Sequence, residues 1–179
     1  MRLKAFSMLL PLVLLIAAQP AGAQSPGRDA TRTQLGALLS SAGSRADVNV
    51  AFRQSTKQPY NFIGTMDTGL ANAESLEIVI SVTPHDTIGF RVYPHYKGNY
   101  INLNRVADST GFMRKLLNYN DQNFLYWGAD EESDVFSGYT MTLESGFPSE
   151  AIVEVLRSIH NTDKYVGELR HFIDGSAAR

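Results

Sequence analysis

Hydrophobic and polar residues alternate along the middle of the chain, which predicts strands that each bury one face. Apolar residues occupy every second position from Leu76 to Val82, with mostly polar residues between them. Residues 83–87 have turn chemistry, and the same spacing resumes from Ile88 to Val92. These segments predict an antiparallel β-hairpin.

A second hairpin is predicted closer to the C-terminus. Aromatic and β-branched residues are concentrated at 124–129 and 135–143, on either side of an acidic turn at 130–134. A further strand is expected at 61–66. The predicted sheet therefore consists of two hairpins and one additional strand.

Apolar residues at helical spacing predict three helices. The first covers residues 31–41, and the second covers 101–118 with a restart at Asp108 or Ser109. The last follows an apolar stripe from Ile152 to Ile173, with a polar interruption at 161–163. The order of elements predicts an α+β fold, with an antiparallel sheet and helices packed on one of its faces.

The first 23 residues are predicted to be a signal peptide. Arg2 and Lys4 precede an apolar run at 8–18, and Ala21-Gly22-Ala23 provides the small residues of a cleavage site after Ala23. An uncleaved anchor is the weaker alternative, because a membrane span needs about 20 apolar residues. We therefore expect a periplasmic or secreted protein, with one domain over residues 24–179 and its ordered part at 31–173.

Composition narrows the classes of partner. The chain has no cysteine, which excludes disulfides and a lipidated cysteine. Its formal net charge is −2, and removal of Arg2 and Lys4 with the leader lowers it to −4. With no basic run, nucleic acid and anionic membrane surfaces are not expected partners, and no membrane span is expected after cleavage.

Catalytic and cofactor signatures are not found in the sequence. It contains neither a G-x-S-x-G elbow nor a glycine-rich phosphate loop, and its four histidines are not paired at metal-binding spacings. We expect no enzyme activity, no cofactor and no metal. One remaining alternative is an enzyme whose site is assembled from distant residues and uses His95 or His160. For residues 130–134 we expect a solvated turn, and the alternative is that their carboxylates bind a cation.

Aromatic residues with polar tips are the strongest candidates for partner binding, because such rings are enriched where proteins bind partners or stack on flat ligands. The alternative is that many of them belong to the core. The candidates are Tyr93, His95, Tyr96, Tyr100, Tyr126, Trp127, Phe136 and Tyr139.

The order of elements resembles that of the YbjN family, whose fold is similar to that of the small chaperones of type III secretion. The resemblance involves the hairpin at 76–93, an asparagine-containing helix near 102–105, the hairpin at 124–143 and the long final helix. It implies a non-enzymatic module of the kind described as a sensory transduction regulator, with a homodimer as an expected assembly.

Two functions follow as expectations. The first is an exported interaction or regulatory module that binds a protein or peptide on a sheet face or groove. The second is a periplasmic domain that binds a small ligand or glycan through the aromatic residues around Tyr96 and Trp127.

Overall fold

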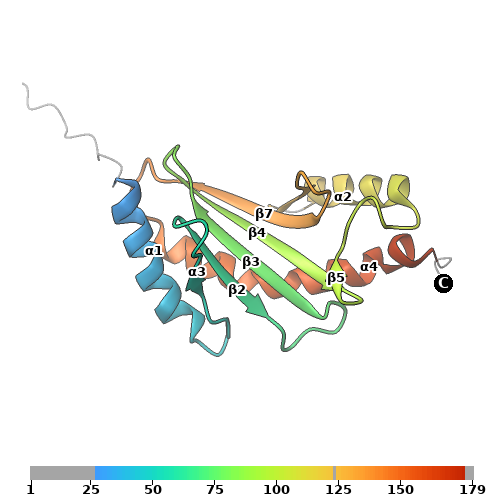
Figure 1. Ribbon diagram of the computed structural model, residues 1–179, viewed down its shortest axis with the longest axis horizontal. Helices are drawn as coiled ribbons and strands as arrows, with labels where there is room; N and C mark the ends of the chain where they lie inside the picture. Colours follow the sequence, from blue (N-terminus) through green and yellow to red (C-terminus); the bar gives the residue numbers. More distant parts are fainter. Residues whose placement is uncertain (1–26, 123, 176–179) are drawn as a thin grey trace, which may run out of the picture.

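The computed structural model describes residues 27–122 and 124–175 of the chain (Figure 1). The predicted signal peptide lies outside these described residues. Within them, seven strands form one antiparallel sheet in the order β1-β2-β3-β4-β7-β6, with β5 paired to β4. The strands are β1 (Arg53–Gln54), β2 (Asn61–Met66), β3 (Ser75–Val82), β4 (Thr87–Tyr96), β5 (Asn99–Tyr100), β6 (Tyr126–Ala129) and β7 (Val135–Thr142).

The helices cover one face of this sheet, which confirms the predicted α+β class. They are α1 (Arg28–Gly43), α2 (Ser109–Gln122), α3 (Ser149–Ser158), the 3-10 turn η1 (Ile159–Asn161) and α4 (Thr162–Asp174). In the view of Figure 1, α3 and α4 run behind the strands and α1 flanks β2 and β3, while α2 lies beyond β7 at the end of the sheet. None of the helices in the described ranges is long and apolar enough to cross a membrane.

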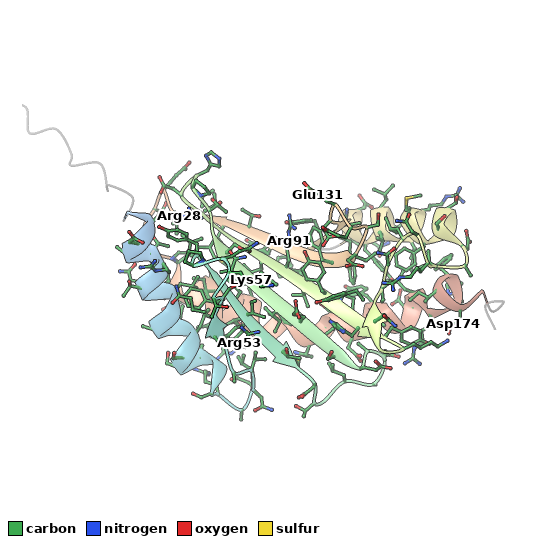
Figure 2. The ribbon with its side chains drawn as sticks, viewed as in Figure 1. Arg28, Arg53, Lys57, Arg91, Glu131 and Asp174 are labelled. Carbon is green, nitrogen blue, oxygen red and sulfur yellow. The ribbon has the colours of Figure 1, made fainter. Side chains whose placement is uncertain are left out.

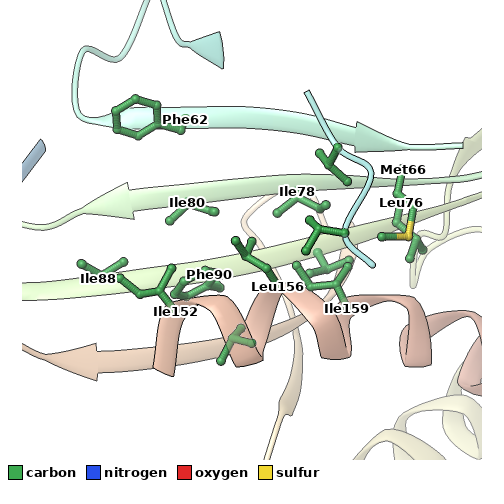
Figure 3. Close-up of a cluster of buried hydrophobic side chains, with 14 of the residues drawn as sticks. Phe62, Met66, Leu76, Ile78, Ile80, Ile88, Phe90, Ile152, Leu156 and Ile159 are labelled. Carbon is green, nitrogen blue, oxygen red and sulfur yellow. The ribbon is translucent and has the colours of Figure 1, made fainter. Parts of the chain in front are cut away.

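The core lies between the sheet and these helices. The predicted alternation in β3 is confirmed, because Leu76, Ile78 and Ile80 are fully buried on the helix side. Figure 3 shows them in one cluster with Ile152 and Leu156 of α3. Each fully buried aliphatic side chain contributes about 1.5–3 kcal/mol to stability.

The final helical stripe is confirmed as a buried face, but the single long helix is not. The chain changes from α-helix to a 3-10 turn at Ile159 and returns to α-helix at Thr162. The interruption coincides with side chains that bond outside the helix. The hydroxyl of Thr162 lies 3.1 Å from that of buried Ser137, and Asp163 binds the loop before β3.

The prediction of a helix from residue 101 is wrong over residues 101–108, which form β-bridge and turn structure. The side chain of Asn102 explains the difference, because its amide donates to Asp134 Oδ1 at 2.7 Å and to the carbonyl of Glu132 at 2.8 Å. The restart is confirmed. Helix α2 begins at Ser109, and Asp108 Oδ1 accepts from the N–H of Gly111 at 2.9 Å. The asparagine-containing helix that contributed to the YbjN resemblance is therefore not formed.

Candidate functional site: the open face of the sheet

The sheet face opposite the helices carries the candidate site. We call it the open face and define it by the outward side chains of five strands. These are Asn61, Ile63, Glu77, Val79, Ser81, Arg91, Tyr93, Tyr126, Phe136 and Thr140. A hollow of about 670 Å³ lies on this face, between the loop that contains Gln58 at one end and Tyr100 with the acidic turn at the other. In Figure 2, Arg91 lies on the near side of the sheet, with no helix in front of it.

Two glycines allow aromatic rings to lie across the end of the open face. The register of β6 and β7 places Tyr126 opposite Gly138 and Gly128 opposite Phe136. A Cβ atom on Gly138 would lie 2.7 Å from Cζ of Tyr126, and one on Gly128 would lie 3.2 Å from Cζ of Phe136. Each ring thus occupies space that a side chain on the opposite strand would fill.

Arg91 lies at the centre of this aromatic group. Its guanidinium carbon is 4.5 Å from the centroid of the Phe136 ring, and Nη1 donates to the hydroxyl of Tyr93 at 3.4 Å. The Tyr93 hydrogen bond is the largest of the effects that raise the pKa of Arg91, and burial opposes it. Within the described residues, Arg91 forms no ion pair within 4.0 Å. A stacked and exposed guanidinium of this kind can bind a planar acceptor from a partner.

Tyr93 and Tyr100 keep their hydroxyl protons at neutral pH, because the pKa of each is raised above its usual value of 10. Burial, followed by the nearby Glu77 carboxylate, raises the pKa of Tyr100 to about 12. Burial also raises the pKa of Tyr93, although Arg91 opposes the change. The Tyr93 ring contacts Tyr100 and Phe136 at centroid distances of 5.8 and 5.5 Å, and the His95 ring contacts that of Tyr100 in a tilted arrangement at 4.2 Å.

The acidic turn at 130–134 forms one wall of the hollow. Asp130 Oδ1 accepts the N–H groups of Glu132 at 3.1 Å and Asp134 at 2.9 Å, so this oxygen stabilises the turn itself. Asp134 binds Asn102 and lies 3.7 Å from Arg105. Within the described ranges, no group of three or more histidines and carboxylates is placed to hold a metal ion.

Five of the eight predicted binding residues come together on or beside the open face, although they are distributed over the four strands β4, β5, β6 and β7. They are Tyr93, His95, Tyr100, Tyr126 and Phe136. Cross-strand pairing explains the grouping, because His95 lies opposite Tyr100, and β7 places Phe136 between the rings of Tyr93 and Tyr126.

The other three predicted residues lie on the helix side. Trp127 is 5% exposed and packs against Tyr119 and Tyr165, so it belongs to the core and not to an accessible surface. Tyr139 contacts Phe124 on that side, and the hydroxyl of Tyr96 donates to Asp174 at 2.9 Å. Trp127 and Tyr96 therefore do not form the shared glycan surface that the sequence suggested.

The histidines were the other residues that the sequence analysis considered for catalysis or metal binding. His160 contacts the backbone carbonyl of Arg157 in its own helical segment, and His171 stacks on the ring of Phe172. In the described part of the chain, neither His95 nor His160 forms a hydrogen bond with a carboxylate or a serine. The geometry that the dispersed-site alternative requires is thus not present among these residues.

Sequence reasoning missed the charged members of the site, Arg91 and Glu77. It also missed the uncharged residues around them, which are Asn61, Ile63, Val79, Ser81 and Thr140. Arg91 shares its strand face with Tyr93 and His95 through period-two spacing, and that spacing could have identified it. Its contact with Phe136 depends on the register between β4 and β7, which no local pattern specifies.

Comparison with known proteins does not assign the chain to a family: no protein-family model, curated protein or solved structure matches it.

Proposed function

We propose that the protein is an exported, non-enzymatic binding module that holds an extended segment of a protein or peptide partner on its open face. The observation that carries the proposal is the group formed by Arg91, Tyr93, Tyr126 and Phe136 on a sheet face that no helix covers in the described structure. Stacked arginine and tyrosine side chains are the residue types most often found at the energetic centre of protein interfaces.

The shape of the hollow supports an extended partner. A drug-sized ligand is usually enclosed by its pocket over most of its surface. The hollow instead lies along a sheet face and is lined by polar residues of the four adjacent strands β2, β3, β4 and β7, including Asn61, Ser81 and Thr140. A chain laid across these strands would find donors and acceptors at intervals of about 4.8 Å.

The test is a selection of linear peptides from a random displayed library, using protein that lacks residues 1–23. Selected peptides are then titrated by calorimetry against wild type, Arg91→Ala and Tyr126→Ser. We expect each substitution to weaken binding by about tenfold or more, which is 1.4 kcal/mol. Arg32→Ala is the charge-matched control, because Arg32 lies on α1 and pairs with Asp29.

Two results would overturn this proposal. One is a library that yields no peptide above background. The other is a set of peptides that bind Arg91→Ala and Tyr126→Ser as tightly as they bind wild type.

A glycan is the second candidate, and it is favoured by the rings of Tyr93 and Tyr126 beside the carboxylate of Asp130 in a hollow of about 670 Å³. That volume lies within the range of small-ligand sites, about 300–1,000 Å³. A glycan array probed with wild type and with Tyr126→Ser separates the two candidates. Binding of a defined glycan that depends on Tyr126, together with peptide selections that fail, would favour the glycan.

A further inference from the structure

Helix α2 has apolar residues on two of its sides, one of which is buried and the other exposed. Its inner side buries Phe112, Leu116 and Tyr119 against the rest of the fold. Its outer side exposes Met113 and Leu117, at 45% and 68% of their surface, and Phe124 follows shortly after the helix at 66%. These are three of the four large hydrophobic side chains that are exposed in the described residues. Single exposed apolar residues are common, but two on the same side of one helix, with a third shortly after its end, indicate an interface.

Two opposite charges flank the exposed Leu117. At about 100° per residue, Arg114, Leu117 and Asp121 fall within one narrow sector of the helix, on the side away from Leu116. Arg114 lies about one turn before Leu117, and Asp121 lies about one turn after it. Neither charge takes part in an ion pair within 4.0 Å in the described structure.

We propose that this outer side of α2 binds the same side of α2 in a second copy of the chain, with the two helices antiparallel. A twofold axis beside Leu117 brings the two Leu117 side chains together. The same operation places Arg114 of each copy opposite Asp121 of the other, giving two equivalent ion pairs. Met113 then faces the end of the other α2, where Phe124 follows.

Self-complementarity is the reason for choosing a second copy as the occupant. A twofold axis places Arg114 of one copy opposite Asp121 of the other when it passes midway between them. This midpoint lies between Leu117 and Asn118, because Arg114 precedes Leu117 by three residues and Asp121 follows it by four. An unrelated partner would impose no such symmetry on one helix. The surface shares no residue with the open face, so this proposal does not depend on the proposed function.

The contact is small, and its strength follows from its size. Helix α2 has 14 residues and is therefore about 21 Å long. One helix pair of this length buries less than a standard interface of about 1,600 Å², so we expect a dissociation constant in the micromolar range.

Sedimentation velocity over a concentration series, from about 1 μM to about 1 mM, tests the proposal. We expect wild type to change from monomer to dimer across the series and Leu117→Asp to remain monomeric. Arg114→Glu and Asp121→Arg should each raise the dissociation constant by about tenfold or more. The double variant, which exchanges the two charges, should return it to within about threefold of wild type. Arg53→Glu, on β1, is the control and should dimerise like wild type (Figure 2).

Circular dichroism and thermal melts verify that each variant is folded, which we expect because the substituted side chains are exposed. A wild-type protein that stays monomeric at the highest concentration would overturn the proposal. So would a dimer that is unaffected by Leu117→Asp, or a double variant that is no better than the single ones. Binding of α2 to a different protein would then be the explanation for the exposed side chains.

Discussion

Asp163 shows how much one side chain contributes when it joins distant segments. It is 8% exposed at the start of α4, and its carboxylate accepts the N–H groups of Ala71, Asn72 and Ala73 and the side-chain amide of Asn72. Burial alone would raise its pKa, but these hydrogen bonds outweigh burial and hold the pKa below the ordinary value of 3.8. The ionised form is therefore the one that the folded state favours.

A pH-dependent loss of stability follows from this shift. Because the folded pKa is lower than the unfolded one, Asp163 contributes stability above about pH 4 and loses it as the pH falls through the folded pKa. We expect Asp163→Asn to lower the free energy of unfolding by about 2 kcal/mol at pH 7, with the difference from wild type narrowing towards pH 3. Urea titrations at a series of pH values measure this difference.

Asp86→Asn is the matched control for that series. Asp86 is exposed in the turn between β3 and β4 at a φ of 49°, a conformation that asparagine also adopts. Its effect should stay within about 0.5 kcal/mol at every pH. If Asp163→Asn were equally neutral, the carboxylate would not hold the loop before β3.

Gly138 provides a second prediction at the scale of a single residue. Gly138→Ala would place Cβ 2.7 Å from Cζ of Tyr126 and 2.9 Å from the carbonyl oxygen of Phe90. We expect it to lower the free energy of unfolding by about 2 kcal/mol and to displace the Tyr126 ring. Gly89 lies in β4 on the same face of the sheet as Gly138, and a Cβ added there would have no atom within 4 Å. Gly89→Ala should therefore be neutral or slightly stabilising. Equal melting temperatures for the two variants would contradict the proposed packing.

At the scale of elements, α2 completes the sheet as well as covering its end. Strand β6 is the last strand in the order, so no strand among the described residues pairs with its outer edge. The side chain of Asn120 replaces one, because its carbonyl oxygen accepts from the N–H of Trp127 and its amide donates to the carbonyl of Trp127 at 3.2 Å. An edge satisfied in this way is less available for pairing with another chain.

Loss of this interaction should destabilise the protein and expose the edge. We expect Asn120→Ala to lower the free energy of unfolding by about 1–2 kcal/mol and to increase aggregation on heating. Light scattering during a thermal ramp detects the aggregation. Asn118→Ala is the control, because Asn118 is exposed on the same helix and has no hydrogen bond to its side chain within the described structure. Identical scattering curves for the two variants would show that Asn120 does not protect the edge.

At the scale of the whole molecule, the sheet separates the buried helix side from the open face, and the adjacent residues Trp127 and Tyr126 lie on these two sides. Trp127, the single tryptophan, is buried on the helix side, whereas Tyr126 is on the open face. We expect Trp127 fluorescence to resist quenching by acrylamide in the folded protein, to change on unfolding, and to change little when a peptide binds. A Tyr126→Trp substitution in a Trp127→Phe background should instead respond to the peptide. A large change in Trp127 emission on binding would indicate that the partner reaches the core side.

The sequence predicted the hairpin of β3 and β4 because strict alternation, as in Leu76 to Val82, depends only on local spacing. It predicted the hairpin of β6 and β7 because aromatic and β-branched residues flank an acidic turn, which is also a local signal. It did not predict the turns at 101–108, because the bonds of Asn102 to Glu132 and Asp134 join segments about 30 residues apart. The same limit applies to the site. The aromatic types identified five of its residues, but their arrangement around Arg91 depends on cross-strand register.

The two hydrogen bonds of Asn120 also help to fix the register of β6 against β7. Successive strand residues point to opposite faces, so a slip of one residue in β6 would bring Tyr126 into the core and turn Trp127 out to solvent. Asn120 engages both backbone groups of Trp127 and would have to release them for such a slip to occur. A side chain on α2, which is not part of the open face, thereby determines which aromatic ring the open face presents.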